Sequence, residues 1–108
     1  MKKLIAAGAA TALTAGALAI PAFAATKTVQ VKDNKFVASS ITVSKNTTVK
    51  WVWKGKAPHN VVVTKGPAKF KSTTQVKGSF SKKLTKKGTY SILCTIHAPG
   101  MKMTVKVK

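Results

Sequence analysis

Four side chains that bind soft or borderline metal ions stand out in this chain, and three of them lie in one short segment. Cys94, His97 and Met101 occur in the sequence Cys-Thr-Ile-His-Ala-Pro-Gly-Met, and His59 is the only other histidine in the chain. A thiolate, two imidazoles and a weak thioether form the donor set of a type 1, or blue, copper site. The residues therefore predict one copper ion bound by His59, Cys94, His97 and Met101.

Other metals fit this donor set less well, because zinc gains little from a thioether. Covalent haem attachment through Cys-x-x-Cys-His needs a second cysteine, and Cys94 is the only one. Taken singly, each candidate also has an ordinary structural interpretation, since Cys and Met often pack in cores and His often lies at the surface. Their joint occurrence at loop positions and strand ends of one small domain favours the metal site.

Met103 is a second thioether close to the same segment. It shares the period-two face of Val105 and Val107, which predicts that it points into the core of the domain. We therefore prefer Met101 as the sulfur ligand.

The elements that must position these donors are strands, because most of the chain after residue 25 alternates with a period of two. Between residues 65 and 78 the pattern weakens, which predicts an irregular connection. Several short strands separated by turns indicate an all-β chain, a Greek-key β-sandwich of about seven to eight strands. The expected strands cover 28–32, 41–43, 49–54, 59–64, 79–84, 89–94 and 102–108.

The first 24 residues have the pattern of a secretory signal peptide. Lys2 and Lys3 precede an apolar run that ends at Pro21 and the sequence Ala22-Phe23-Ala24. Small residues at these positions predict cleavage after Ala24, which leaves residues 25–108 as one copper-binding domain. We therefore expect an exported protein, periplasmic or extracellular, and a retained membrane anchor is the alternative.

The charge of the chain is extreme. Of 108 residues, 20 are lysines and one, Asp33, is acidic, so the formal charge is +19 and falls to +17 when Lys2 and Lys3 are removed. Nucleic acid is not the expected partner, because the protein is predicted to be exported and has no arginine to bind phosphate and guanine with a bidentate fork. Acidic redox proteins fit better, as do anionic membrane or cell-wall surfaces.

The mature sequence resembles the cupredoxins, especially the small plastocyanin, amicyanin and pseudoazurin group. The segments that carry the resemblance are Pro58-His59-Asn60-Val61, Gly88-x-Tyr90 and the loop from Cys94 to Met101. The resemblance implies a copper at one end of the sandwich, with the edge of His97 close to an apolar surface. It also implies that Asn60 braces the copper site through Thr95. Asn46 stands where the family often has Gly, and Asn tolerates a left-handed turn.

These observations predict a soluble, monomeric one-electron carrier and not an enzyme. With both histidines used by the copper and Asp33 the only carboxylate side chain, no group is left for acid–base catalysis. A protein that sequesters or delivers copper would use the same ligands and is the main alternative. A cationic surface-binding protein with incidental copper is a third interpretation.

Overall fold

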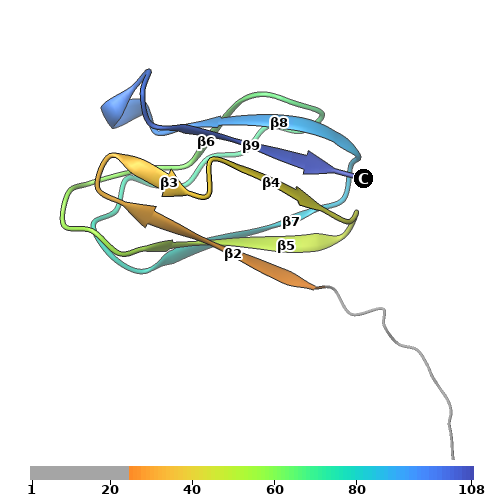
Figure 1. Cartoon of the computed structure of the whole chain (residues 1–108), viewed down its shortest axis with the longest axis horizontal. Helices are drawn as coiled ribbons and strands as arrows, with labels where there is room; N and C mark the ends of the chain where they lie inside the picture. The colour runs from red at the N-terminus through yellow and green to blue at the C-terminus, as the bar shows by residue number, and fades with distance from the viewer. Residues whose placement is uncertain (1–24) are drawn as a thin grey trace, which may run out of the picture.

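The computed structural model describes residues 25–108 and contains eight strands in these residues (Figure 1). The predicted signal peptide, residues 1–24, lies outside the described residues. The strands are β2 (Thr26–Lys32), β3 (Lys35–Val37), β4 (Ser40–Val43), β5 (Thr47–Trp53), β6 (Val62–Lys65), β7 (Ser79–Leu84), β8 (Gly88–Leu93) and β9 (Lys102–Val107).

The strands form two four-stranded sheets packed face to face, in the orders β3-β2-β5-β7 and β4-β9-β8-β6. The pairings β2 with β5 and β4 with β9 are parallel, and the others are antiparallel. From β3 to β8 each connection crosses to the other sheet, as in a Greek-key sandwich, whereas β2–β3 and β8–β9 are neighbours within one sheet. The antiparallel β8–β9 pair, in which Leu93 faces Lys102, leaves the loop of residues 94–101 at one end of the sandwich.

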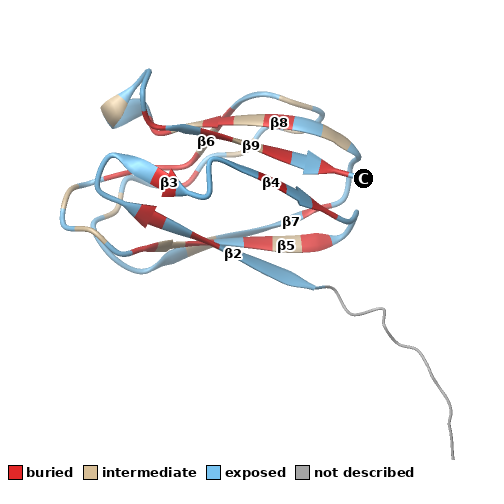
Figure 2. Ribbon diagram, in the orientation of Figure 1, coloured by how far each residue is buried: buried red, intermediate tan, exposed pale blue. Residues whose placement is uncertain are grey.

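One face of each strand fills the core between the sheets, as Figure 2 shows. In β5 the buried residues alternate with residues that are partly or fully exposed, and Val49, Trp51 and Trp53 point inward. The same alternation buries Met103, Val105 and Val107 of β9. Burial of apolar side chains contributes about 1.5–3 kcal/mol for each large residue. This core holds the ends of β5, β8 and β9 in fixed register, and those ends carry the loops that matter below.

The all-β prediction is confirmed, with two local differences. β3 is a three-residue strand around Phe36 that the sequence pattern did not predict. The expected strand 59–64 is displaced, because β6 covers only Val62–Lys65 and His59 makes an isolated bridge to Gln75. Residues 65–78 contain no named strand beyond the start of this range, as expected. Asn46 has the left-handed φ of 75° that its turn position predicts.

In residues 25–108 no helix is long and apolar enough to cross a membrane.

Candidate metal centre

The predicted donors come from two separate parts of the chain. His59 lies between β5 and β6, where its backbone N–H donates to Gln75 O at 2.9 Å and its C=O accepts from Gln75 N at 3.0 Å. The Trp53 indole N–H also donates to His59 O, at 3.1 Å. Three hydrogen bonds therefore fix the backbone of His59 against neighbouring segments.

The other donors lie on the loop between β8 and β9. Cys94 directly follows β8 and is fully buried, and His97 ends a 3-10 turn, Thr95–His97. The loop closes on itself, because Cys94 N donates to Met101 O at 2.9 Å and Met101 N donates to His97 O at 3.3 Å. The hairpin register of β8 and β9 thus brings Met101 back beside Cys94.

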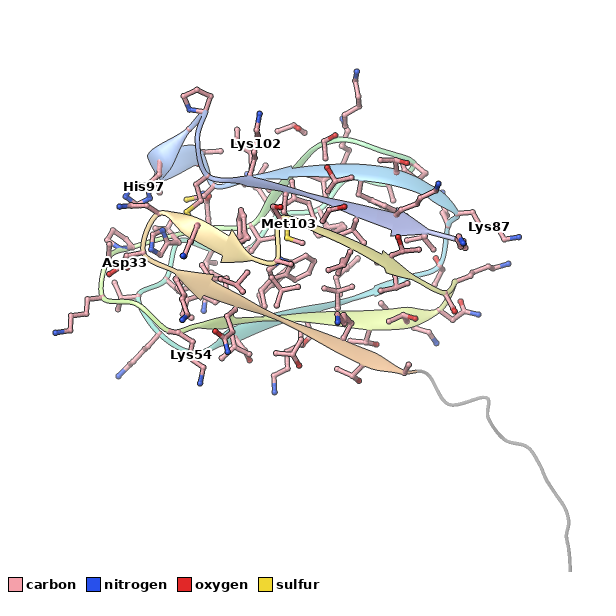
Figure 3. All side chains as sticks on the ribbon, in the orientation of Figure 1. Asp33, Lys54, Lys87, His97, Lys102 and Met103 are labelled. Carbon is pink, nitrogen blue, oxygen red and sulfur yellow. The ribbon has the colours of Figure 1, made fainter. Side chains whose placement is uncertain are left out.

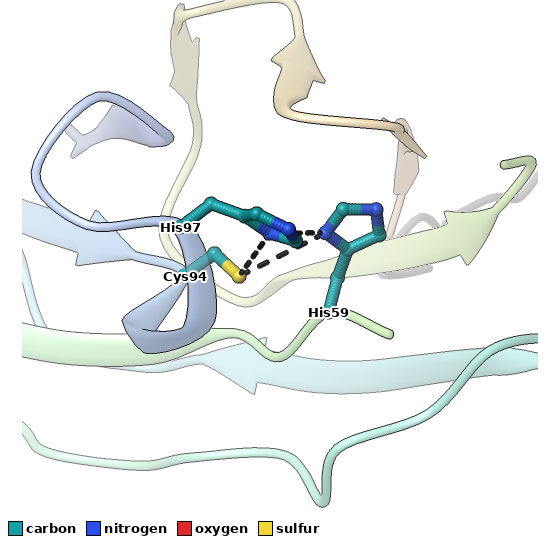
Figure 4. A group of neighbouring side chains, drawn as sticks. All are labelled: His59, Cys94 and His97. Carbon is teal, nitrogen blue, oxygen red and sulfur yellow. Dashed lines mark hydrogen bonds between the residues drawn. The ribbon is translucent and has the colours of Figure 1, made fainter. Parts of the chain in front are cut away.

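His59, Cys94 and His97 converge at one point (Figure 4). The two Nδ1 atoms of His59 and His97 are 3.1 Å apart. Cys94 Sγ lies 3.9 Å from His59 Nδ1 and 3.7 Å from His97 Nδ1. The sequence places these residues 35 and 3 positions from the cysteine, and the fold collects them in a triangle of donor atoms.

The size of this triangle suits a metal ion. A point equidistant from the three atoms lies about 2.1 Å from each, within the range of roughly 2.0–2.3 Å at which imidazole nitrogen and thiolate sulfur bind first-row ions such as zinc. Trigonal coordination by two histidines and one cysteine is the arrangement that blue copper adopts. The donor set and its geometry therefore fit type 1 copper.

The two candidate thioethers lie in different surroundings. Met101 is buried, at 1% exposure, in the donor loop. Met103 lies within the sandwich (Figure 3), and its Sδ accepts a hydrogen bond from the Trp51 indole N–H at 3.4 Å. Met103 is thus a core residue with a partner of its own, as its strand parity predicted.

Asn60 connects the two halves of the centre, as the resemblance implied. Its side-chain N–H donates to Thr95 Oγ1 at 2.8 Å, and its Oδ1 accepts from Thr95 N at 2.8 Å. The pair forms a two-point bridge from the His59 segment to the residue after Cys94. The expected bracing between Asn60 and Thr95 is confirmed.

Sequence reasoning missed Asp33, which lies at the same end of the sandwich as His97 (Figure 3). Asp33 Oδ1 is 3.0 Å from His59 Nε2, the ring nitrogen that faces away from the donor triangle. Backbone N–H groups of Ala57 and Lys56 also donate to its carboxylate. These bonds, with the Ala57 N–H and then the His59 ring as the strongest contributors, lower the pKa of Asp33 from 3.8 to about 2. The sequence offered one indication of a role for Asp33, which is that it is the single acidic residue among 20 lysines.

The two histidines differ in exposure. His59 is fully buried, whereas His97 is only partly covered by its loop. Around His97 the loop presents Ile96, at 47% exposure, together with Ala98, Pro99 and Gly100, all exposed. The centre therefore lies beneath an apolar surface through which His97 reaches towards solvent.

Residues 24–108 match the family model of copper binding proteins, plastocyanin/azurin family. Among solved structures, an oxidised methionine variant of amicyanin is 29% identical over 76% of this chain and 81% of that one, with a TM-score of 0.68. A reduced proline variant of amicyanin is 29% identical over 82% and 86%, also at 0.68. The copper-containing nitrite reductase of Thermus scotoductus is 26% identical over 83% of this chain but 23% of its own, at 0.67. No curated protein matches at the sequence level.

Proposed function

Because the chain belongs to the plastocyanin/azurin family of copper-binding proteins, we propose that it is a blue-copper electron carrier working between redox partners outside the cytoplasm. Its cofactor is type 1 copper, and the ligands we assign are His59, Cys94, His97 and Met101. The observation that carries the proposal is the convergence of His59, Cys94 and His97 beneath a surface that His97 reaches. A buried site with one solvent-facing ligand can exchange electrons without admitting a substrate.

When bound, copper supplies a one-electron couple between Cu(II) and Cu(I). With this couple the protein would receive one electron from one partner and pass it to a second. The chain contributes a fixed donor set: Cys94 supplies the thiolate, His59 and His97 supply imidazoles through Nδ1, and Met101 supplies the weak sulfur donor. The bridge between Asn60 and Thr95 holds the two halves together, so little needs to rearrange when the charge of the site changes.

We propose further that the protein is not an enzyme, although it shares its fold with part of a nitrite reductase. Such an enzyme needs histidines for additional copper, and this chain has only His59 and His97. The chain also matches less than a quarter of the reductase. Amicyanin, in contrast, is matched over most of its length.

Copper delivery would use the same ligands, so the decisive difference is whether the metal stays bound. The reduced protein should exchange electrons rapidly with a small redox protein while losing little Cu(I) to a competing chelator such as bathocuproine disulfonate. Fast loss of Cu(I) with slow electron exchange would instead identify a delivery protein. Binding to anionic polymers that persists unchanged in Cys94→Ser would favour the cationic surface-binding alternative.

The charge of the chain suggests an acidic partner. Lys54 and Lys56 precede His59 and Lys102 follows Met101, so each lies within five positions of a ligand in the sequence, and all three are exposed. Charges at the rim of a small, weak interface act mostly on the rate of encounter. Because about 0.15 M salt limits the range of exposed charges to roughly 8 Å, electron transfer to an acidic protein should slow steeply as salt rises.

Stopped-flow measurements against one acidic and one basic redox protein of similar potential would test this partner choice. Replacing Lys54, Lys56 and Lys102 with Gln should reduce both the rate with the acidic partner and its salt dependence. Replacing Lys45, Lys87 and Lys108, which are exposed on other turns and at the C-terminus, is the matched control and should have a smaller effect. If the basic protein reacts as fast at low salt, the lysines do not select the partner.

A further inference from the structure

Asp33 makes contacts that its position in the sequence does not suggest. It follows β2 at the turn into β3, and its carboxylate accepts three hydrogen bonds from the segment before His59: Lys56 N to Oδ1 at 3.0 Å and to Oδ2 at 3.1 Å, and Ala57 N to Oδ1 at 2.9 Å. The same Oδ1 lies 3.0 Å from His59 Nε2. One side chain thus connects the β2–β3 turn, the loop before His59 and the ring of His59.

The chemistry of the two groups fixes which His59 nitrogen carries the proton. A carboxylate only accepts hydrogen bonds, so His59 Nε2 must be the N–H donor. In the neutral ring the proton on Nε2 leaves Nδ1 with a lone pair, and Nδ1 is the atom in the donor triangle with Cys94 and His97. The contact with Asp33 therefore selects the tautomer and ring orientation that a metal requires.

Gly55 has to be a glycine for this arrangement to form. A Cβ at Gly55 would overlap the Asp33 carboxylate and lie 2.8 Å from the Asp33 backbone nitrogen. At the other side, Asn34 adopts a left-handed φ of 67°, which completes the tight turn after Asp33. Gly55 and Asn34, which flank the contact between Asp33 and the loop before His59, are thus residue types that tolerate close backbone approach or a left-handed φ.

We propose that Asp33 is a positioning residue of the copper centre, which locks the His59 ring with Nδ1 towards the metal and whose negative charge favours Cu(II) over Cu(I). Asp33 is the only acidic residue in a chain with 20 lysines. It is therefore the only side chain that can place a negative charge beside the site. It is partly open to solvent, at 44% exposure, whereas His59 is fully buried, so the charge acts on the centre through the buried ring. This inference rests on His59 being a copper ligand.

Three variants separate the effect of the Asp33 charge from that of its hydrogen bond to His59 and from that of the net charge of the protein. Asp33→Asn removes the charge but retains an oxygen acceptor, and Asp33→Ala removes both. Thr42→Lys raises the net charge by one unit, as Asp33→Asn does, but at an exposed position on β4 that pairs with β9 away from the donor loop. Cyclic voltammetry of the copper protein gives the potential, and nitrogen-15 NMR of the metal-free protein gives the tautomer of His59.

In Asp33→Asn the ratio of Cu(II) to Cu(I) affinity should fall roughly tenfold, which is a rise of about 59 mV for a one-electron couple. Asp33→Ala should also lose the uniform Nε2–H tautomer of His59 and bind copper roughly 10–100-fold more weakly. Thr42→Lys should change neither the potential nor the tautomer.

An unchanged potential in Asp33→Asn, or an equal shift in Thr42→Lys, would overturn the proposal. So would a wild-type His59 that carries its proton on Nδ1, which can be measured even if the variants do not fold. The proposed function fails separately, since a wild-type protein without a thiolate–copper absorption band would contradict the copper site itself.

Discussion

The two histidines of the centre sit in opposite surroundings. His59 is fully buried, its backbone is held by Gln75 and Trp53, and its ring contacts Asp33. His97 ends a short 3-10 turn in a loop whose tip is exposed. The difference indicates a division of labour, in which the buried half fixes the geometry of the centre and the loop half brings one ligand to the surface.

The largest expected effect on the link between the two halves comes from removing copper. If free copper is about 1,000 times its Kd, binding adds about 4 kcal/mol to the free energy of unfolding. For a domain of this size that corresponds to a rise in Tm of roughly 15–30 °C. The metal-free protein should still melt cooperatively, because both sheets and most core residues lie outside the loop, which contributes only Cys94 and Met101 to the core. Equal Tm values in calorimetry with and without tightly bound copper would contradict the proposed linkage.

Asn60→Ala should break the side-chain bridge between the two halves. It removes two partly buried hydrogen bonds to Thr95, each contributing about 0.5–1.5 kcal/mol, so the free energy of unfolding should fall by about 1–3 kcal/mol. Thr73→Ala, which removes an exposed hydroxyl that donates to Gln75, is the matched control. It should change stability by less than about 0.5 kcal/mol. Urea denaturation of the metal-free variants would measure both, and equal losses would argue against a bridging role for Asn60.

The two methionines sharpen the contrast between loop and core. Met101→Leu should raise the reduction potential and change the visible spectrum, because a sulfur donor that favours Cu(II) is lost. Met103→Leu should leave the spectrum unchanged and lower the free energy of unfolding by about 1 kcal/mol, since the Trp51 N–H loses its acceptor. The opposite pattern, with the spectrum altered only in Met103→Leu, would show that the ligand assignment is wrong.

The smallest expected effect concerns acid. The pKa of Asp33 is lowered from 3.8 to about 2 in the folded protein, so the ionised carboxylate stabilises the fold at pH values above 3.8. This contribution should be lost as the pH falls from about 4 towards 2. Denaturation of the metal-free protein across this range should therefore show a pH dependence that Asp33→Asn lacks. Parallel profiles for the two proteins would contradict the lowered pKa.

The sequence predicted the fold and the donor triangle for physical reasons that are local. Period-two alternation reports which strand face is buried, so Met103 was assigned to the core correctly. Cys94 and His97 are close along the chain, and His59 was the only other histidine. The contact between Asp33 and His59 was not predictable in this way, because it depends on how the β2–β3 turn meets the loop after β5. The bounds of β6 were displaced for a similar reason, since His59 and Val62 pair with the irregular segment at Gln75 and Lys71.

Titration of the mature protein with Cu(II), followed by visible absorption, tests the central claim most directly. Cys94 is the only residue able to form a short thiolate bond to copper, so an intense blue or green band should grow to saturation at one equivalent. The Cys94→Ser variant should lack that band even where it binds Cu(II). A wild-type protein that remains colourless with one Cu(II) bound would contradict the type 1 copper centre.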